Sequence, residues 1–262
     1  MKLDMLYSTH DDGIYSLLEK VPEYHPRTNI IIIHQIINEK NYDDISYKLE
    51  NRNDIDYYKL KSKGVTKSRN LAIKKSKNDI ILFCDDDTSY KDGFQDFILR
   101  QYETNEDIDF ITFSYSQKNK ILPKFSKIKF KHNIKTILSV GTIEITCKSN
   151  ILKEKKLFFP EDMGAGEKYF LCDEPVFLSR LLKDKLKGIY IPYIICEHPD
   201  ESSGSIFNHR NAYASRLLCF IRIFGFSLGR ILYLFFIIKN INKFNSLKNF
   251  NLAISVFFSN LR

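Results

Sequence analysis

The first 205 residues of this 262-residue chain predict an α/β fold, a doubly wound and mostly parallel sheet flanked by helices. Short β-type runs alternate with stretches whose apolar residues recur at helical spacing. Several of the β-type runs are apolar throughout, as strands covered on both faces are. We expect strands at residues 1–7, 29–34, 79–84, 109–115 and 188–195, and helices at 65–76, 91–102 and 174–187.

The composition excludes several classes of protein. With 44% hydrophobic residues, 27% charged residues and a mean hydropathy of -0.28, the chain is neither disordered nor a multi-span membrane protein. Its five cysteines are far apart and lack zinc-binding spacing, so we expect reduced thiols. The acidic pair Asp11 and Asp12 comes before any apolar run of a signal peptide develops, which predicts a cytoplasmic location.

The net charge of +8 comes from the C-terminal part of the chain. Residues 202–262 contain eight of the 40 basic side chains and none of the 32 acidic ones. The first 201 residues therefore carry 32 charges of each sign. We expect a neutral domain over residues 1–205 and a basic, apolar helical tail over residues 206–262.

The sharpest chemical signal is the run Asp85, Asp86 and Asp87, directly after the apolar segment DIILFC. Adjacent carboxylates repel each other unless a cation or a solvated turn relieves the repulsion. Mg²⁺ and Mn²⁺ prefer carboxylate oxygen, and α/β sheets bind ligands beyond the carboxyl ends of their strands. The run predicts a site for one of these ions, and an acidic surface turn is the alternative.

Residues 64–73, GVTKSRNLAI, lead into the helix that precedes this strand. Thr66 and Ser68 are candidate caps for that helix, while Lys67 and Arg69 are placed to meet anionic groups near its positive end. The alternative is an ordinary capped amphipathic helix.

Two further clusters follow predicted loops and strands. In GAGEKYFLCDE, Gly164 and Gly166 make a flexible loop, and Asp173 and Glu174 open a helix, either as a general base at a pocket or as favourable charges at a helix start. In EHPDESSG, residues 197–204, His198 is a candidate ligand for the same metal ion, or a solvated loop histidine.

The order of these clusters resembles the family 2 glycosyltransferases, the inverting sugar-nucleotide enzymes of GT-A fold. That family shows an Arg-Asn helix start, a strand ending in D-x-D, and a glycine-bearing acceptor loop ending in an acidic pair. Here SRNLAI, ILFCDDD and GAGEKYFLCDE occur in that order, and STHDD and IIHQ are similar to the bacterial subgroup that assembles surface polysaccharide, such as O-antigen or capsule. The acidic pair is reversed, and the second strand ends in His34 and Gln35 instead of acidic residues.

The resemblance implies a mechanism and a set of site residues. Mn²⁺ or Mg²⁺ held by Asp87 and Asp85, with His198, would neutralise the diphosphate of a nucleotide-sugar donor, most typically UDP-Gal or UDP-Glc. The second position of the acidic pair would make Glu174 the general base, whereas the aspartate that the family usually has there would make Asp173 the base. Gly164 and Gly166 would contact a saccharide acceptor, often lipid-linked through undecaprenyl diphosphate. The implied nucleotide-sugar contacts are Ser8, Thr9, Gln35, Lys67, Arg69, Asn70, Asp85 and Asp86.

Two other classes of protein share part of the pattern. A D-x-D motif after an apolar strand also approximates the nucleophile motif of haloacid-dehalogenase-like phosphatases, although that motif belongs on the first strand of its domain. Residues 117–135 hold seven lysines and no acid, which with the basic tail is typical of nucleic-acid-binding proteins. The order of the clusters favours the transferase, with no nucleic acid as partner.

The tail predicts contact with a membrane surface. Residues 217–238 are long enough to cross a bilayer but contain Arg222 and Arg230, which favours a helix lying in the interface. On one continuous helix Arg216, Arg222 and Arg230 would share a sector, and Lys239, Lys243 and Lys248 continue the basic pattern. We expect peripheral association with the anionic inner face of the cell membrane. The alternative is a helical extension packed on the catalytic domain or on a dimer partner.

Overall fold

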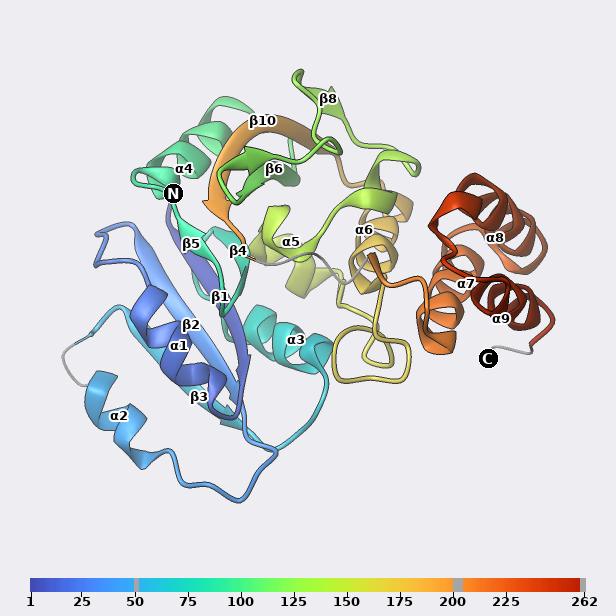
Figure 1. Cartoon of the computed structure of the whole chain (residues 1–262). Helices are drawn as coiled ribbons and strands as arrows, with labels where there is room; N and C mark the ends of the chain where they lie inside the picture. Colours follow the sequence, from blue (N-terminus) through green and yellow to red (C-terminus); the bar gives the residue numbers. More distant parts are fainter. Residues whose placement is uncertain (50–51, 200–204, 260–262) are drawn as a thin grey trace.

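The computed structural model describes residues 1–49, 52–199 and 205–259. Two parts of the sequence-based predictions lie outside these ranges: residues 200–204 of the cluster around His198, and Arg262 of the basic tail. The described residues form a ten-stranded sheet with helices on both faces, and a group of C-terminal helices packs to one side (Figure 1). The predicted fold class is confirmed.

One half of the sheet is entirely parallel. Its strands lie in the order β3-β2-β1-β4, and β9 then runs antiparallel between β4 and β6, with β10 parallel to β6 beyond it. The strands are β1 (Leu3–His10), β2 (Thr28–Gln35), β3 (Ile55–Leu60), β4 (Ile80–Asp85), β5 (Ser89–Tyr90), β6 (Phe110–Gln117), β7 (Lys120–Ile121), β8 (Phe130–Lys131), β9 (Ile145–Lys148) and β10 (Gly188–Glu197).

Alternation along the strands divides the core into two layers. Met5 and Tyr7 of β1 face the layer that α1 (Gly13–Lys20), α2 (Asp43–Leu49) and α4 (Phe94–Thr104) cover. Leu6 faces the opposite layer, beneath α3 (Val65–Lys75), α5 (Ser149–Glu154) and α6 (Asp173–Lys183). Burial on both faces explains why these strands read as unbroken apolar runs.

The predicted strands are all present, and the predicted helices appear with shifted ends. The helix expected from residue 91 begins at Phe94, because Gly93 adopts a positive φ of 72°. The helix expected to reach residue 187 ends at Lys183. Sequence patterning missed α1, α2, α5, β3 and β9, which are short or only partly apolar.

The tail is not one helix. It forms α7 (Arg210–Phe224), α8 (Phe226–Lys239), a 3₁₀ turn η4 (Ile241–Lys243) and α9 (Leu247–Phe257). The chain turns at Gly225, whose φ is 85°, and α8 packs so closely on α7 that a Cβ at Gly229 would lie 2.6 Å from the Phe220 carbonyl oxygen. Within the described ranges, no helix has both the length and the apolar character needed to cross a bilayer.

The break in the tail also separates its arginines, so the expected shared sector of one helix is wrong. Arg222 forms an ion pair with Asp162, in the segment before α6. Arg216 donates to the Ile206 carbonyl oxygen at 2.8 Å, and Arg230 donates to the Phe257 and Ser259 carbonyl oxygens. Helix α7 packs on α6, in agreement with the predicted alternative that the tail packs on the rest of the chain. Contact of the tail with a membrane stays a prediction.

Candidate active site

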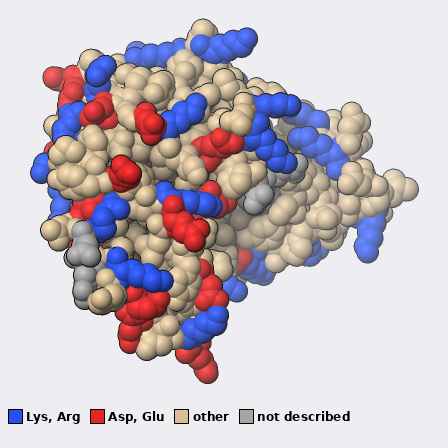
Figure 2. Space-filling model, turned by 60° about the vertical axis from the view of Figure 1, so that its left-hand side comes forward, with Lys and Arg blue, Asp and Glu red and all other residues tan. Residues whose placement is uncertain are grey.

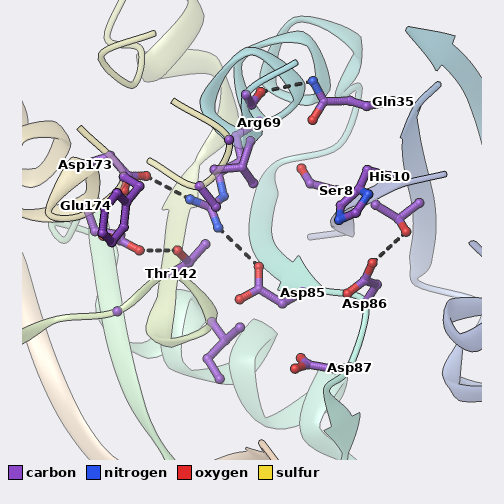
Figure 3. A pocket seen from close by; sticks show the side chains of 18 of the residues that line it. Ser8, His10, Gln35, Arg69, Asp85, Asp86, Asp87, Thr142, Asp173 and Glu174 are labelled. Atoms are coloured by element: carbon purple, nitrogen blue, oxygen red, sulfur yellow. Dashed lines mark hydrogen bonds and ion pairs between the residues drawn. The ribbon is translucent and has the colours of Figure 1, made fainter. Parts of the chain in front are cut away.

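A cavity of about 530 Å³ lies at the carboxyl ends of β1, β2 and β4 (Figure 3). Parallel register places Ser8 of β1 beside Asp85 of β4, and His10 beside Gln35 of β2. Since the carboxyl ends of parallel strands meet at one edge, polar residues distant in sequence become neighbours there. Ser8, Thr9, Gln35, Arg69, Gly166 and His198, all predicted site residues, line this cavity together with Asp85, Asp86, Asp87, Asp173 and Glu174.

The three adjacent aspartates have three different partners. Asp85 Oδ1 lies 3.2 Å from Arg69 Nη2, Asp86 Oδ2 accepts a 2.6 Å hydrogen bond from Thr9 Oγ1, and Asp87 Oδ2 lies 3.4 Å from His198 Nε2. Burial raises the pKa of Asp86, and the Thr9 hydrogen bond opposes that effect. These partners offset part of the mutual repulsion, although the charges of Asp85 and Asp87 still raise the pKa of Asp86.

The predicted metal ligands do not converge as a set of three. Among the described residues, no cluster of three or more His, Cys, Asp or Glu side chains has a metal-binding arrangement, and Asp85 faces Arg69 instead. Asp87 and His198 lie close enough to bind one ion together. Two protein ligands fit Mg²⁺ or Mn²⁺ in a nucleotide site, because such ions take their other ligands from phosphate and water.

Arg69 joins the aspartate run to the acidic pair. It is 5% exposed, and its Nη1 lies 2.9 Å from Asp173 Oδ2 while Nη2 faces Asp85 (Figure 3). Burial and the charge of Glu174 raise the pKa of Asp173 to about 7, against the lowering effect of Arg69. Cys172, just before α6, has a left-handed φ of 68°, an uncommon conformation for a non-glycine residue. It turns the chain so that both acidic side chains reach the cavity.

Glu174 is held by a residue that sequence reasoning missed. Thr142 Oγ1 donates a 2.5 Å hydrogen bond to Glu174 Oε1, from the 3₁₀ turn η2 (Thr142–Glu144). Glu144 supports that turn by accepting from the Gly141 amide at 2.9 Å, and its carboxylate forms an ion pair with Lys124. Burial raises the pKa of Glu144 to about 7 although Lys124 lowers it. The alternating run TIEITC at residues 142–147, which covers η2 and most of β9, was the signal in the sequence that could have identified this segment.

Three predicted site residues have other positions. Lys67 and Asn70 do not line the cavity that the described residues form. Lys67 Nζ lies 2.7 Å from Glu167 Oε1, and the Asn70 amide bonds to both the backbone nitrogen and the carbonyl oxygen of Phe159. Gly164 packs behind the acidic pair, where a Cβ would lie 3.1 Å from Asp173 Cγ. Of the two predicted acceptor-loop glycines, Gly166 alone lines the cavity.

The start of α3 also differs from expectation. Neither Thr66 nor Ser68 caps the helix, because its N-cap is Gly64. Thr66 Oγ1 instead donates to the Met163 carbonyl oxygen at 2.9 Å, and Ser68 Oγ donates to Ser8 Oγ at 2.9 Å. These contacts fix the helix between the segment before α6 and β1. They explain why polar residues occur on the buried side of α3.

Gln35 lines the cavity and secures the chain before α3. Its Nε2 donates to the carbonyl oxygens of Ser62 and Gly64 at 2.8 and 3.1 Å. Sequence reasoning did not identify several other lining residues, which come from loops and strand ends: His10, Ile37, Lys63, Tyr115, Ile143, Phe170 and Leu171.

The sheet order, with helices on both faces, is that of the GT-A fold. The structure is similar to the crystal structure of S. aureus TarS 1-349, with a TM-score of 0.70 and 15% identity over 98% of this chain and 80% of that one. It is also similar to TarS 1-349 in complex with UDP-GlcNAc, with a TM-score of 0.68 and 13% identity over 98% and 79% of the two chains. At these identities the likeness shows the fold.

The chain belongs to glycosyl transferase family 2, whose family model matches residues 11–157. The match includes Arg69, the Asp85–Asp87 run and Thr142, and ends before the acidic pair. No curated protein sequence matches the chain. Family membership favours glycosyl transfer over the phosphatase interpretation, and β4, which carries the aspartates, is preceded along the chain by β1, β2 and β3.

Proposed function

We propose that the protein transfers a hexose, with inversion, from UDP-Gal or UDP-Glc to a hydroxyl group of a saccharide acceptor. The observation that carries the proposal is the arrangement of one cavity: Glu174 approaches it from α6, and the Asp85–Asp87 run enters it from β4 (Figure 3). The similar TarS 1-349 was crystallised with UDP-GlcNAc and with UDP, which supports a uridine-nucleotide donor here.

The donor diphosphate belongs beside Asp87 and His198 in this proposal. Those two side chains would hold Mn²⁺ or Mg²⁺, which when bound supplies positive charge to the leaving diphosphate. Ser8, Thr9 and Gln35 are at the strand ends where the nucleoside would lie. Arg69 keeps Asp85 and Asp173 in position and balances their charge beneath the donor.

Glu174 is the proposed general base. Asp173 is 3% exposed and paired with Arg69, whereas Glu174 is half-buried and has one carboxylate oxygen oriented by Thr142. The acceptor hydroxyl oxygen attacks the anomeric carbon, the bond from that carbon to the diphosphate oxygen breaks, and its electron pair leaves with UDP. The hydroxyl proton passes to Glu174. A positioned base of this kind contributes roughly a hundred- to ten-thousand-fold in rate.

The proposed acceptor is a lipid-linked saccharide in the assembly of a surface polysaccharide such as O-antigen or capsule. The resemblance of STHDD and IIHQ to the corresponding bacterial subgroup supports this choice. The side of the cavity near α6 also presents Phe170 and Leu171, and an aromatic ring suits the apolar face of a sugar.

The test is a donor panel of UDP-Gal, UDP-Glc and UDP-GlcNAc with Mn²⁺, measuring UDP release with and without saccharide acceptors. We expect donor-dependent UDP release that EDTA abolishes. Asp87→Asn should abolish it without loss of stability, since the substitution relieves carboxylate repulsion. Asp92→Asn, an exposed aspartate outside the cavity lining, is the matched control and should retain activity. UDP release that survives EDTA and Asp87→Asn would contradict the metal assignment, and no release with any donor would contradict the function.

A further inference from the structure

The helix α8 is apolar on both of its sides. Its inner side, with Gly229, Tyr233 and Ile237, is buried against α7 and α9. On the other side Leu228, Ile231, Phe235 and Ile238 are 50%, 50%, 62% and 65% exposed. At 3.6 residues per turn these four side chains fall within an arc of about 80°. We call these four residues the outer face of α8.

A helix that is apolar all round is normally covered on all sides. The outer face of α8 has large aliphatic and aromatic side chains in an unbroken stripe, and contiguous exposed apolar surface marks an interaction site. In Figure 2 the C-terminal helices form the projecting right-hand part of the molecule, which is mostly tan with blue side chains and shows no red ones on the visible face. We therefore expect another surface to cover the outer face of α8.

The charges beside the outer face have one sign. Lys239 lies about 20° around the helix from Leu228, and Lys239, Lys243 and Lys248 are all exposed. In the part of the chain that the structure describes, none of these three lysines forms an ion pair, and residues 202–262 contain no Asp or Glu. The outer face is thus an apolar stripe with the cation Lys239 at one end. Lys243 lies over the Phe207 ring and Lys248 is in α9, so these two add positive charge to the tail without lying on the stripe.

This charge pattern distinguishes between two kinds of partner. In a two-fold contact between copies of the chain, each tail would present the same cations to the other and no tail carboxylate would balance them. An anionic lipid surface supplies both the apolar phase and the negative charge. We propose that the outer face of α8 docks on an anionic lipid surface, with Lys239 at the headgroups and the exposed Lys248 of the tail adding electrostatic attraction. This proposal does not depend on the donor or the acceptor.

The test measures co-sedimentation of the full-length chain with vesicles of phosphatidylcholine alone or mixed with phosphatidylglycerol. We expect binding to the mixed vesicles that weakens with salt. Ile231→Ser, Phe235→Ser and Ile238→Ser combined should abolish it. Lys239→Glu combined with Lys248→Glu should lower the affinity about tenfold or more. Ile128→Ser and Lys127→Glu are matched controls, because both residues are exposed in the segment between β7 and β8. Circular dichroism checks that each variant is folded.

Three results would overturn the proposal. One is no sedimentation with the mixed vesicles, and another is sedimentation that neither set of substitutions weakens. The third is a concentration-dependent dimer, seen by sedimentation velocity, that the serine substitutions abolish while vesicle binding is absent. That last result would assign the outer face of α8 to contact between two copies of the chain.

Discussion

The cavity and the C-terminal helices both contain a largely buried arginine, but the two arginines have different partners. Arg69 bridges two carboxylates, Asp85 and Asp173, at 3.2 and 2.9 Å. Arg230 donates to the carbonyl oxygens of Phe257 and Ser259 at the end of α9, and its guanidinium lies 4.6 Å from the Phe226 ring centroid. Arg69 thus balances charges that face a ligand cavity, whereas Arg230 closes a helix end.

The difference indicates what each region is built for. Carboxylates are costly to bury, so a site that gathers them needs a cation such as Arg69 to hold them there. Cations near the C-terminal end of a helix are favourable by themselves, because they complement its dipole and its free carbonyl groups. We therefore expect substitutions in the first region to change catalysis and those in the second to change stability.

The largest effect is expected at the acidic pair. Glu174→Gln should lower kcat by roughly a hundred- to ten-thousand-fold with donor binding nearly unchanged, because a base acts mainly in the transition state. Asp173→Asn should lower kcat less and also lower Tm, since it removes a partner of buried Arg69. Steady-state kinetics and donor titration separate the two variants. The reverse ranking would make Asp173 the base.

A direct comparison of the two arginines comes next. Arg69→Gln should lower kcat/KM about ten- to a hundredfold, because two carboxylates lose their cation. Arg230→Gln should preserve kcat and lower the free energy of unfolding by about 1 to 2 kcal/mol, through lost hydrogen bonds at the end of α9. Kinetics and urea unfolding of both variants measure this. An Arg230→Gln enzyme with impaired kcat would show that the two regions are not separate in function.

The hydrogen bond from Thr142 to Glu174, the proposed base, predicts a smaller catalytic effect. Thr142→Val removes the hydrogen bond to Glu174 while preserving shape, and should lower kcat about tenfold. Thr142→Ser keeps the hydroxyl group and should recover most of that loss. KM for the donor should not change in either variant. Equal kcat values for the valine and serine variants would mean that the hydroxyl group does not position Glu174.

The smallest effect concerns acid stability, which we expect to depend on neither the cavity nor the tail but on a buried histidine of the sheet domain. His132 is buried beside Thr112, and burial lowers its pKa to about 4. Between about pH 4 and 6.5 the unfolded chain binds more protons at this residue, so its contribution to stability is complete above about pH 6.5 and is lost as the pH falls toward 4. Urea unfolding across this range should show a pH slope that His132→Gln reduces, by at most about 1.4 kcal/mol per pH unit. An unchanged slope would assign acid sensitivity to other groups.

Local signals were sufficient to predict much of the first region. Unbroken apolar runs marked β1, β2, β4, β6 and β10, and helical spacing marked α3, because both patterns arise within a few residues. The aspartate run at the end of β4 and Arg69 at the start of α3 were identified for the same reason. Their positions, at the end of a strand and at the start of a helix, were enough to predict that both belong to one site.

Only the tertiary structure decided which side chains pair. Arg69 contacts Asp173, which is 104 residues away in the sequence, and Thr142 contacts Glu174, which is 32 residues away. Periodic patterns in the sequence extend over only a few residues and cannot predict such contacts. The same limit applies to Lys67 and Asn70, which contact Glu167 and Phe159 instead of the cavity. In the tail, composition determined an apolar, basic segment. Its division into α7 and α8 depended on a turn at Gly225 and close packing at Gly229, and that packing determines which apolar side chains remain exposed.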